Sequence, residues 1–85
     1  MSRLTRKPTV LVVDDMPADL QLISALLREH THVRIATNGA QALEITDRSL
    51  PDLILLDVVM PGMSGHEVCR RLKDNPKTCD VPDFH

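Results

Sequence analysis

The chain has 85 residues, a formal net charge of -2, and 42% hydrophobic and 26% charged residues, an ordinary composition for one small soluble domain. The near-neutral charge and the single aromatic residue, Phe84, argue against nucleic-acid binding, which relies on basic surfaces and stacking platforms. No apolar run approaches the ~20 residues that cross a bilayer, and two cysteines do not make a secreted disulfide framework. We therefore expect a cytoplasmic protein without a membrane span.

The first part of the chain predicts a tail, a strand, a helix and a second strand. Residues 1–8 are basic and are expected to form a disordered tail. Residues 10–13 are all apolar, which predicts a strand that helices cover on both faces. Apolar residues at helical spacing, with Pro17 in the first turn, predict a helix over residues 17–29. Residues 32–36 alternate polar and apolar side chains, which is typical of an edge strand.

The middle of the chain predicts a second helix and a third strand. Asn38 and Gln41 fit an N-cap with its partner three residues on, and they begin a helix that ends at about residue 48. Glu44 and Arg48 have the spacing of an ion pair on that helix. Residues 53–58 are apolar except for one acid, which predicts a deeply buried strand.

The last part of the chain predicts a third helix and only the beginning of a fourth strand. Ser64 and Glu67 fit a capping box, and the helix they begin should end before Pro76. Residues 81–82 look like the opening of a strand, but residues 83–85 diverge where an apolar strand should continue. We expect this fourth strand to remain incomplete.

Strands and helices thus alternate along the sequence. Successive strands that are separated by helices run parallel and are joined by right-handed crossovers. The predicted fold class is therefore α/β, with a parallel sheet that carries helices on both faces. No linker or low-complexity segment interrupts residues 9–82, so we expect one domain over this range.

Acidic residues directly follow two of the predicted strands. Asp14 and Asp15 come after the first strand, and Asp57 comes near the end of the third. Ligands of open parallel sheets bind beyond the carboxyl ends of the strands, so these carboxylates should converge on one site. Magnesium suits such a site because it takes one or two carboxylates and completes its shell with water and phosphate oxygen. Asp57 is the candidate nucleophile toward phosphorus, and the backbone carbonyl of Val59 could add a neutral ligand.

A plainer interpretation of the same acids exists. Aspartate often follows a strand because it favours turns and caps the next helix. A doublet at the end of one strand, together with a single acid at the end of its neighbour, is harder to obtain from turn preference alone. The pattern therefore favours a metal and phosphoryl site.

Three motifs carry a resemblance to a known family. They are VLVVDD at residues 10–15, NGAQAL at residues 38–43 and PDLILLDVVMPGMSG at residues 51–65. Together they resemble the receiver domain of bacterial two-component response regulators, nearly without gaps over residues 9–82. The resemblance implies a flavodoxin-like sheet in the order 2-1-3-4-5, of which about three of the five strand-helix units are expected here.

The resemblance also implies a function and the residues that perform it. Asp57 would accept a phosphoryl group from a phosphohistidine on a sensor histidine kinase or phosphotransfer protein. Asp15, Asp57 and the carbonyl of Val59 would bind Mg²⁺, and Asp14 would assist through water. No direct contact with nucleic acid or membrane is expected.

The sequence departs from the family pattern at its C-terminal end. Receiver domains complete the site with a Ser or Thr after the fourth strand and a Lys after the fifth, and the sequence ends at His85 before either position. The sequence therefore leaves open whether this chain catalyses its own phosphorylation. Without a full fourth strand, residues 53–58 would form an exposed apolar edge, which predicts self-association.

Two functional hypotheses follow. The first is a receiver module of a His-Asp phosphorelay that accepts a phosphoryl group on Asp57 with Mg²⁺. The alternative is a C-terminally truncated, non-catalytic fragment that binds a kinase, or associates with itself through residues 53–58, without productive phosphorylation. Phosphorylation that depends on Asp57 separates the two.

Overall fold

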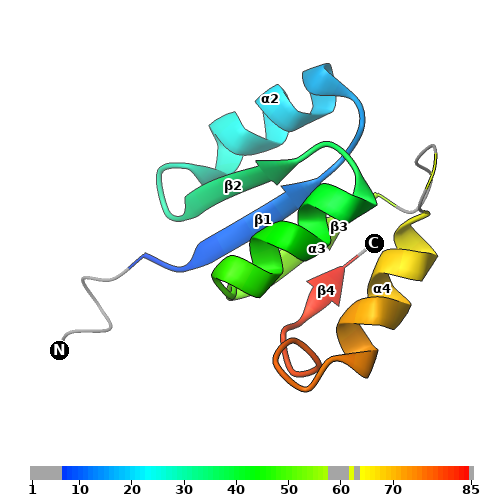
Figure 1. Cartoon of the computed structure of the whole chain (residues 1–85). Coiled ribbons are helices and arrows are strands. Elements are labelled where there is room, and N and C mark those ends of the chain that lie inside the picture. Colours follow the sequence, from blue (N-terminus) through cyan, green and yellow to red (C-terminus); the bar gives the residue numbers. More distant parts are fainter. Residues whose placement is uncertain (1–6, 58–61, 63, 85) are drawn as a thin grey trace, which may run out of the picture.

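The computed structural model describes residues 7–57, 62 and 64–84, and Figure 1 shows the arrangement. Strands and helices alternate along these residues, as the sequence predicts. In chain order the elements are β1 (Thr9–Val13), α2 (Pro17–Leu27), β2 (His32–Ala36), α3 (Gly39–Arg48), β3 (Leu53–Leu56), α4 (Gly65–Asp74) and β4 (Asp83–Phe84). In this part of the chain no helix is long and apolar enough to cross a bilayer.

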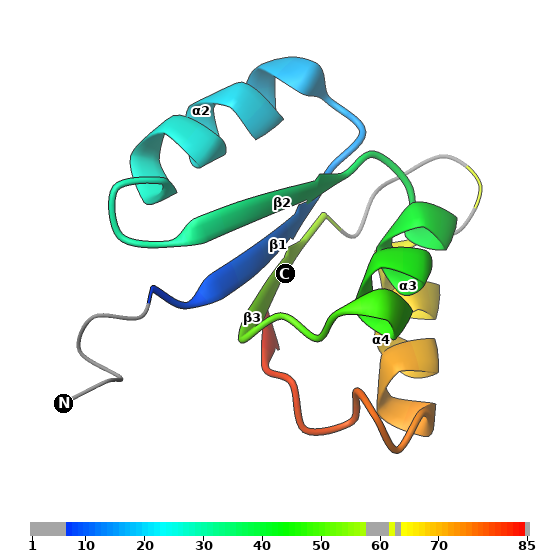
Figure 2. The same cartoon turned by 60° about the vertical axis from the view of Figure 1, so that its left-hand side comes forward.

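The strands form one parallel sheet in the order β2-β1-β3-β4. Figure 2 shows α2 on one face of the sheet and α3 and α4 on the other. This arrangement confirms the predicted α/β class, with a parallel sheet between helices. The sheet order also agrees with the flavodoxin-like order implied by the resemblance, up to the fourth strand.

Strand β1 lies inside the sheet, with a strand on each side. Each of its apolar side chains is buried against one of the two helical layers. Leu11 and Val13 belong to a core cluster with residues of α3 and α4, whereas Val10 and Val12 cluster with Leu20 of α2. Since successive side chains of a strand point to opposite faces, a run of four apolar residues is needed for burial on both sides. This confirms the two-sided burial predicted for residues 10–13.

The helices begin where their capping residues predict. The Asn38 side chain accepts a hydrogen bond from the Gln41 backbone N–H at 2.8 Å, and the Gln41 side chain accepts one from the Thr37 N–H at 2.7 Å. The donor to the Gln41 side chain is thus Thr37, the residue before the cap, and not the cap residue Asn38 itself. Ser64 likewise accepts a hydrogen bond from the Glu67 N–H at 3.2 Å. The contacts to Asn38 and Ser64 satisfy N–H groups that lack partners in the first turn of a helix.

Helix α2 ends at Leu27, two residues before the predicted end at residue 29. The Leu27 carbonyl accepts hydrogen bonds from both the backbone N–H and the hydroxyl of Thr31, each at 2.9 Å. It also accepts one from the His30 N–H at 3.1 Å. This convergence of donors on one carbonyl turns the chain toward β2 and ends the helix early.

The fourth strand corrects two predictions. Strand β4 lies at Asp83–Phe84, within the segment expected to diverge, rather than at residues 81–82. It pairs with Ile54 and Leu55, so the expectation that residues 53–58 form an exposed edge is wrong for these two residues. Parallel pairing uses backbone groups, so the polar side chain of Asp83 does not prevent it. The two edges of the described sheet are therefore β2 and β4.

Other predictions fall partly outside the described residues. Strand β3 ends at Leu56, and residue 58 of the predicted strand lies outside the described part. Of the predicted tail, residues 1–6 lie outside it as well, whereas the Pro8 carbonyl accepts a hydrogen bond from the His32 N–H at 2.8 Å. The domain boundaries at residues 9 and 82 stay predictions.

Candidate metal centre

The backbone of the sheet brings the ends of β1 and β3 together. The pairing of these strands places Val13 beside Leu56, so the acids that follow them emerge at the same edge. The Asp57 N–H donates a hydrogen bond to the Val13 carbonyl at 2.9 Å, and the Asp14 N–H donates one to the Ala36 carbonyl of β2 at 3.1 Å. Both acidic residues are therefore held by the backbone of a neighbouring strand.

The carboxylates of Asp14, Asp15 and Asp57 form one cluster. One carboxylate oxygen from each lies within 4.8 Å of the other two. Asp14 is buried, and the other two acids are half-buried. Carboxylate oxygens are hard ligands that suit Mg²⁺ or Ca²⁺, and partial exposure leaves room for the waters that Mg²⁺ retains. The chemistry of this donor set therefore fits a divalent cation.

The electrostatics of the cluster also favour a cation. Burial raises the pKa of Asp14 above its ordinary value, and the charges of Asp57, Asp19 and Asp15 raise it further. The Met16 N–H opposes this shift in the pKa by donating a hydrogen bond to Asp14 Oδ1 at 2.9 Å. A raised carboxyl pKa means that the fold disfavours the charged form of Asp14. A bound cation would remove the repulsion among these carboxylates.

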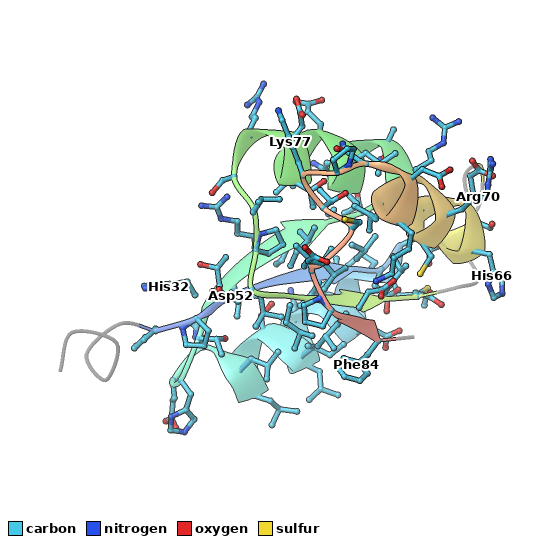
Figure 3. All side chains as sticks on the ribbon, turned by 90° about the horizontal axis from the view of Figure 1, so that it is seen from below. His32, Asp52, His66, Arg70, Lys77 and Phe84 are labelled. Carbon is cyan, nitrogen blue, oxygen red and sulfur yellow. The ribbon has the colours of Figure 1, made fainter. Side chains whose placement is uncertain are left out.

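A hollow of about 470 Å³ adjoins the acidic cluster on the α2 side of the sheet. Asp14, Asp19 and Asp57 contribute its acidic part, and Phe84 of β4 contributes to its apolar wall. Figure 3 shows the Phe84 side chain on the side of β4 that faces α2. The remaining lining residues are Val12, Val13, Ile23, Leu55 and Leu56. The Asp57 side chain therefore borders a space that is open to a ligand.

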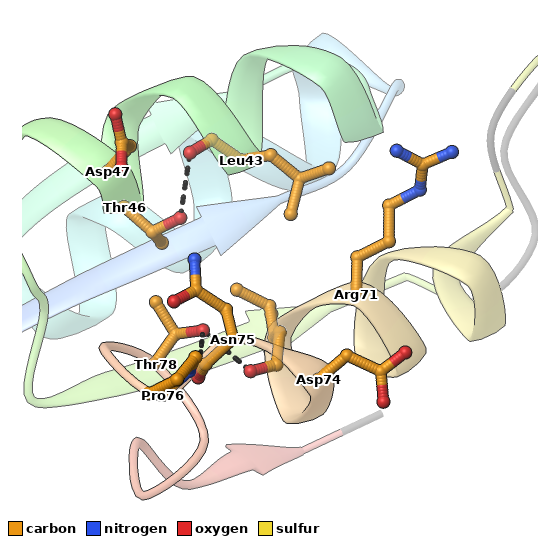
Figure 4. Close-up of a pocket in the computed structure, with 9 residues that line it drawn as sticks. Leu43, Thr46, Asp47, Arg71, Asp74, Asn75, Pro76 and Thr78 are labelled. Atoms are coloured by element: carbon orange, nitrogen blue, oxygen red, sulfur yellow. Dashed lines mark hydrogen bonds between the residues drawn. The ribbon is translucent and has the colours of Figure 1, made fainter.

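A second hollow, of about 530 Å³, lies between α3 and the end of α4 (Figure 4). Several polar groups in its lining bond to protein atoms. The Thr46 hydroxyl donates to the Leu43 carbonyl at 2.9 Å, and Arg71 Nε donates to Glu67 at 2.9 Å. This hollow does not include the acidic cluster, so the chemistry of the strand ends is concentrated in the first hollow.

The structure brings together the three acids that the sequence singled out. The fourth predicted ligand, the carbonyl of Val59, lies outside the described residues. Asp19 was missed, although it lines the acidic hollow and contributes to the raised pKa of Asp14. Its signal in the sequence was its place in the first turn of the helix that directly follows the acidic doublet.

Comparison with known proteins identifies the family. The sequence profile of the response regulator receiver domain matches residues 10–82. The chain belongs to the response regulator receiver family. Response regulator PleD of Caulobacter vibrioides is 51% identical over 74 residues, which cover 86% of this chain and 16% of PleD. A probable cyclic di-GMP phosphodiesterase of Vibrio cholerae is 43% identical over 87% of this chain and 17% of that protein.

Solved receiver structures share the fold. The N-terminal domain of a response regulator receiver protein from Methanoculleus marisnigri superposes with a TM-score of 0.86 at 38% identity, covering 89% of this chain and 63% of that domain. The chain thus spans about a sixth of the length of these two curated relatives and less than two thirds of this receiver structure. It is a phosphorelay receiver module that contains part of the full receiver fold.

Proposed function

We propose that Asp57 accepts a phosphoryl group from a phosphohistidine of a sensor histidine kinase or phosphotransfer protein. Asp14, Asp15 and Asp57, with the carbonyl of Val59, are the proposed Mg²⁺ ligands. The observation that carries the proposal is the approach of the three carboxylates to within 4.8 Å at the carboxyl edge of the sheet, in a chain of the receiver family. When bound, Mg²⁺ would neutralise the charge of the acids and of the incoming phosphoryl oxygens.

The environment of each acid supports Asp57 as the nucleophile rather than Asp14. Asp14 is 8% exposed and its Oδ1 atom accepts the Met16 N–H, so its carboxylate is confined. Asp57 is half-buried and lines the hollow through which a donor can approach. Its backbone is held by the bond to the Val13 carbonyl at 2.9 Å, which keeps the start of the side chain in place. Asp57 therefore combines access with a fixed position.

The proposed step conserves charge and atoms. A carboxylate oxygen of Asp57 attacks phosphorus, and the bond from phosphorus to the imidazole nitrogen of the donor breaks. The released ring nitrogen takes a proton from water, so the products are an acyl phosphate on Asp57 and a neutral imidazole on the donor. Asp14 and Asp15 take no covalent part, since their role is to hold positive charge beside the transferring group.

Intact-protein mass spectrometry tests the proposal. Incubation of the chain with Mg²⁺ and acetyl phosphate should add the mass of one phosphoryl group, and Asp57→Asn should abolish the addition. Asp47→Asn is the matched control, because it makes the same chemical change on an exposed carboxylate of α3 and should leave the addition intact. An unmodified wild-type chain, or equal modification of Asp57→Asn, would contradict the proposal.

A further inference from the structure

Asp83 occupies an unusual place for a carboxylate. Side chains alternate along a strand, so Asp83 points to the same face of the sheet as Val81, which packs against the core cluster below α3 and α4. The Asp83 side chain is only 9% exposed. Phe84 points the other way and is 62% exposed. The two residues of β4 therefore reverse the usual pattern, with the charge inward and the aromatic ring outward.

Two side chains of α4 bond to the Asp83 carboxylate. The Cys69 thiol donates a hydrogen bond to Oδ2, and the Lys73 ammonium lies 3.5 Å from Oδ1. Cys69 and Lys73 are four residues apart, so they lie on the same face of the helix. Lys73 also donates a hydrogen bond to the Cys79 carbonyl at 3.4 Å. One face of α4 thus bonds to the segment that returns to the sheet.

The start of this returning segment is fixed separately. The hydroxyl of Thr78, which is 2% exposed, donates a hydrogen bond to the Leu72 carbonyl at 2.6 Å. The Ile54 N–H donates one to the Pro82 carbonyl at 3.0 Å. Strand β4 itself has only two residues, and so short a strand has little stability of its own. Side-chain contacts to Asp83 are therefore expected to matter for its position.

We propose that Cys69, Lys73 and Asp83 form a latch that fixes the register of β4 on β3. A displacement of β4 by one residue would turn Asp83 to the opposite face of the sheet, away from both partners. On that face Phe84 is 62% exposed, so the displaced carboxylate would be hydrated but would lose both the cation and the thiol donor. The bonds from Cys69 and Lys73 to Asp83 are thus what favours the observed register.

The protonation state of the thiol supports this assignment. Burial, and then the Asp83 carboxylate, raise the pKa of Cys69 to about 11. The thiol therefore keeps its proton at neutral pH and remains a donor. A thiolate in the same place would repel Asp83 instead. Cys69 is thus suited to hold a carboxylate rather than to act as a nucleophile.

The latch has a consequence for the acidic hollow. In the observed register, Phe84 forms part of the wall of the hollow that also contains Asp57. Release of the latch would move this ring and change the shape of the hollow. A change at Cys69 or Lys73 on α4 would therefore alter the wall of the acidic hollow on the opposite face of the sheet.

A fluorine label at position 84 tests the proposal directly. Phe84 is the only aromatic residue, so incorporation of 4-fluorophenylalanine gives a single ¹⁹F resonance without a substitution. Cys69→Ala should shift this resonance and accelerate hydrogen exchange of the Ile54 N–H by about tenfold, the loss expected for one hydrogen bond. Cys69→Ser keeps a donor and should restore most of both signals. Cys79→Ala is the matched control and should resemble the wild type.

A second variant separates local from global effects. Lys73→Met keeps the thiol donor but removes the cation, and its half-exposed position should allow folding. It should also accelerate exchange at Ile54, while exchange at Leu11 in β1 stays as in the wild type. The latch would be overturned if the ¹⁹F resonance and the exchange rates of Cys69→Ala and Lys73→Met were those of the wild type. It would also be overturned if Cys69→Ser had the same effects as Cys69→Ala. Equal acceleration at Leu11 and Ile54 in both variants would overturn it too.

Discussion

Neutralising Asp14 should stabilise the chain in the absence of metal. Asp14→Asn removes one charge from the cluster of three carboxylates. In the wild type the Met16 N–H donates a hydrogen bond to Asp14 Oδ1 at 2.9 Å, and the asparagine Oδ1 can still accept it. Its shape and its backbone contact are therefore kept. The expected change therefore reports the cost of burying this charge together with the repulsion among the acids.

Coulomb's law gives the size of this effect. Two unit charges 4.8 Å apart repel by about 3.5 kcal/mol at an effective dielectric of ~20, and by about 0.9 kcal/mol in water. Asp14 is buried but its two neighbours are half-buried, so the effective value lies between these limits. Asp14→Asn removes its repulsion with both neighbours, so the free energy of unfolding should rise by about 2 kcal/mol or more.

The dependence on pH provides a second signature. Because the pKa of Asp14 is raised in the folded chain, this residue makes the fold less stable as pH rises from its ordinary value of 3.8 through the folded pKa. Asp14→Asn has no carboxyl group at this position and therefore does not lose this stability as pH rises. The difference in stability between Asp14→Asn and the wild type should therefore grow with pH over this window and then stay constant.

Urea denaturation with and without metal is the assay. With a chelator at neutral pH, Asp14→Asn should unfold at higher urea than the wild type, and Asp47→Asn should not. With millimolar Mg²⁺ the wild type should gain more stability than Asp14→Asn, because ligand binding to the folded state adds to its stability. A variant less stable than the wild type in chelator would refute the claim that the charge of Asp14 destabilises the metal-free fold.

Three further predictions follow from the fold. Asn38→Ala should lower the free energy of unfolding by about 1 kcal/mol, measured in urea, because the Gln41 N–H loses its cap. Leu11→Ala should cost about 3 to 5 kcal/mol and leave little folded chain by circular dichroism, since Leu11 is fully buried at the centre of the sheet. Leu22 and Leu26 are 62% and 69% exposed, so the chain should self-associate in sedimentation velocity, and replacing both by Lys should shift it toward monomer. Identical sedimentation of this double variant and the wild type would contradict that role of α2.

The sequence predicted the elements whose pattern is local. Residues 10–13 and 53–56 are continuous apolar runs, and burial between two helical layers is the common reason for such runs in parallel sheets. The caps at Asn38 and Ser64 were visible because each involves a residue only three positions away. The convergence of the acids followed from strand ends that are adjacent in a parallel sheet.

The features that were missed depend on contacts between distant residues. The sequence pattern predicts β4 two residues too early because Asp83 interrupts the apolar residues. The residue that bonds to Asp83 in the structure, Cys69, is 14 positions away. Asp19 was missed for a related reason. Its contribution to the site appears only when α2 is folded back over the end of β1.

The acidic site and the apolar core depend on the same two strands. Val13 and Leu56 are buried side by side, and the next residue of each strand belongs to the acidic cluster. The core interactions therefore offset the repulsion that pushes the acids apart. Metal binding removes that repulsion, so it should also strengthen the pairing of β1 with β3. It follows that Mg²⁺ should slow hydrogen exchange of the Asp57 N–H, which bonds to the Val13 carbonyl, more than exchange of the Thr78 N–H, which lies in the segment after α4.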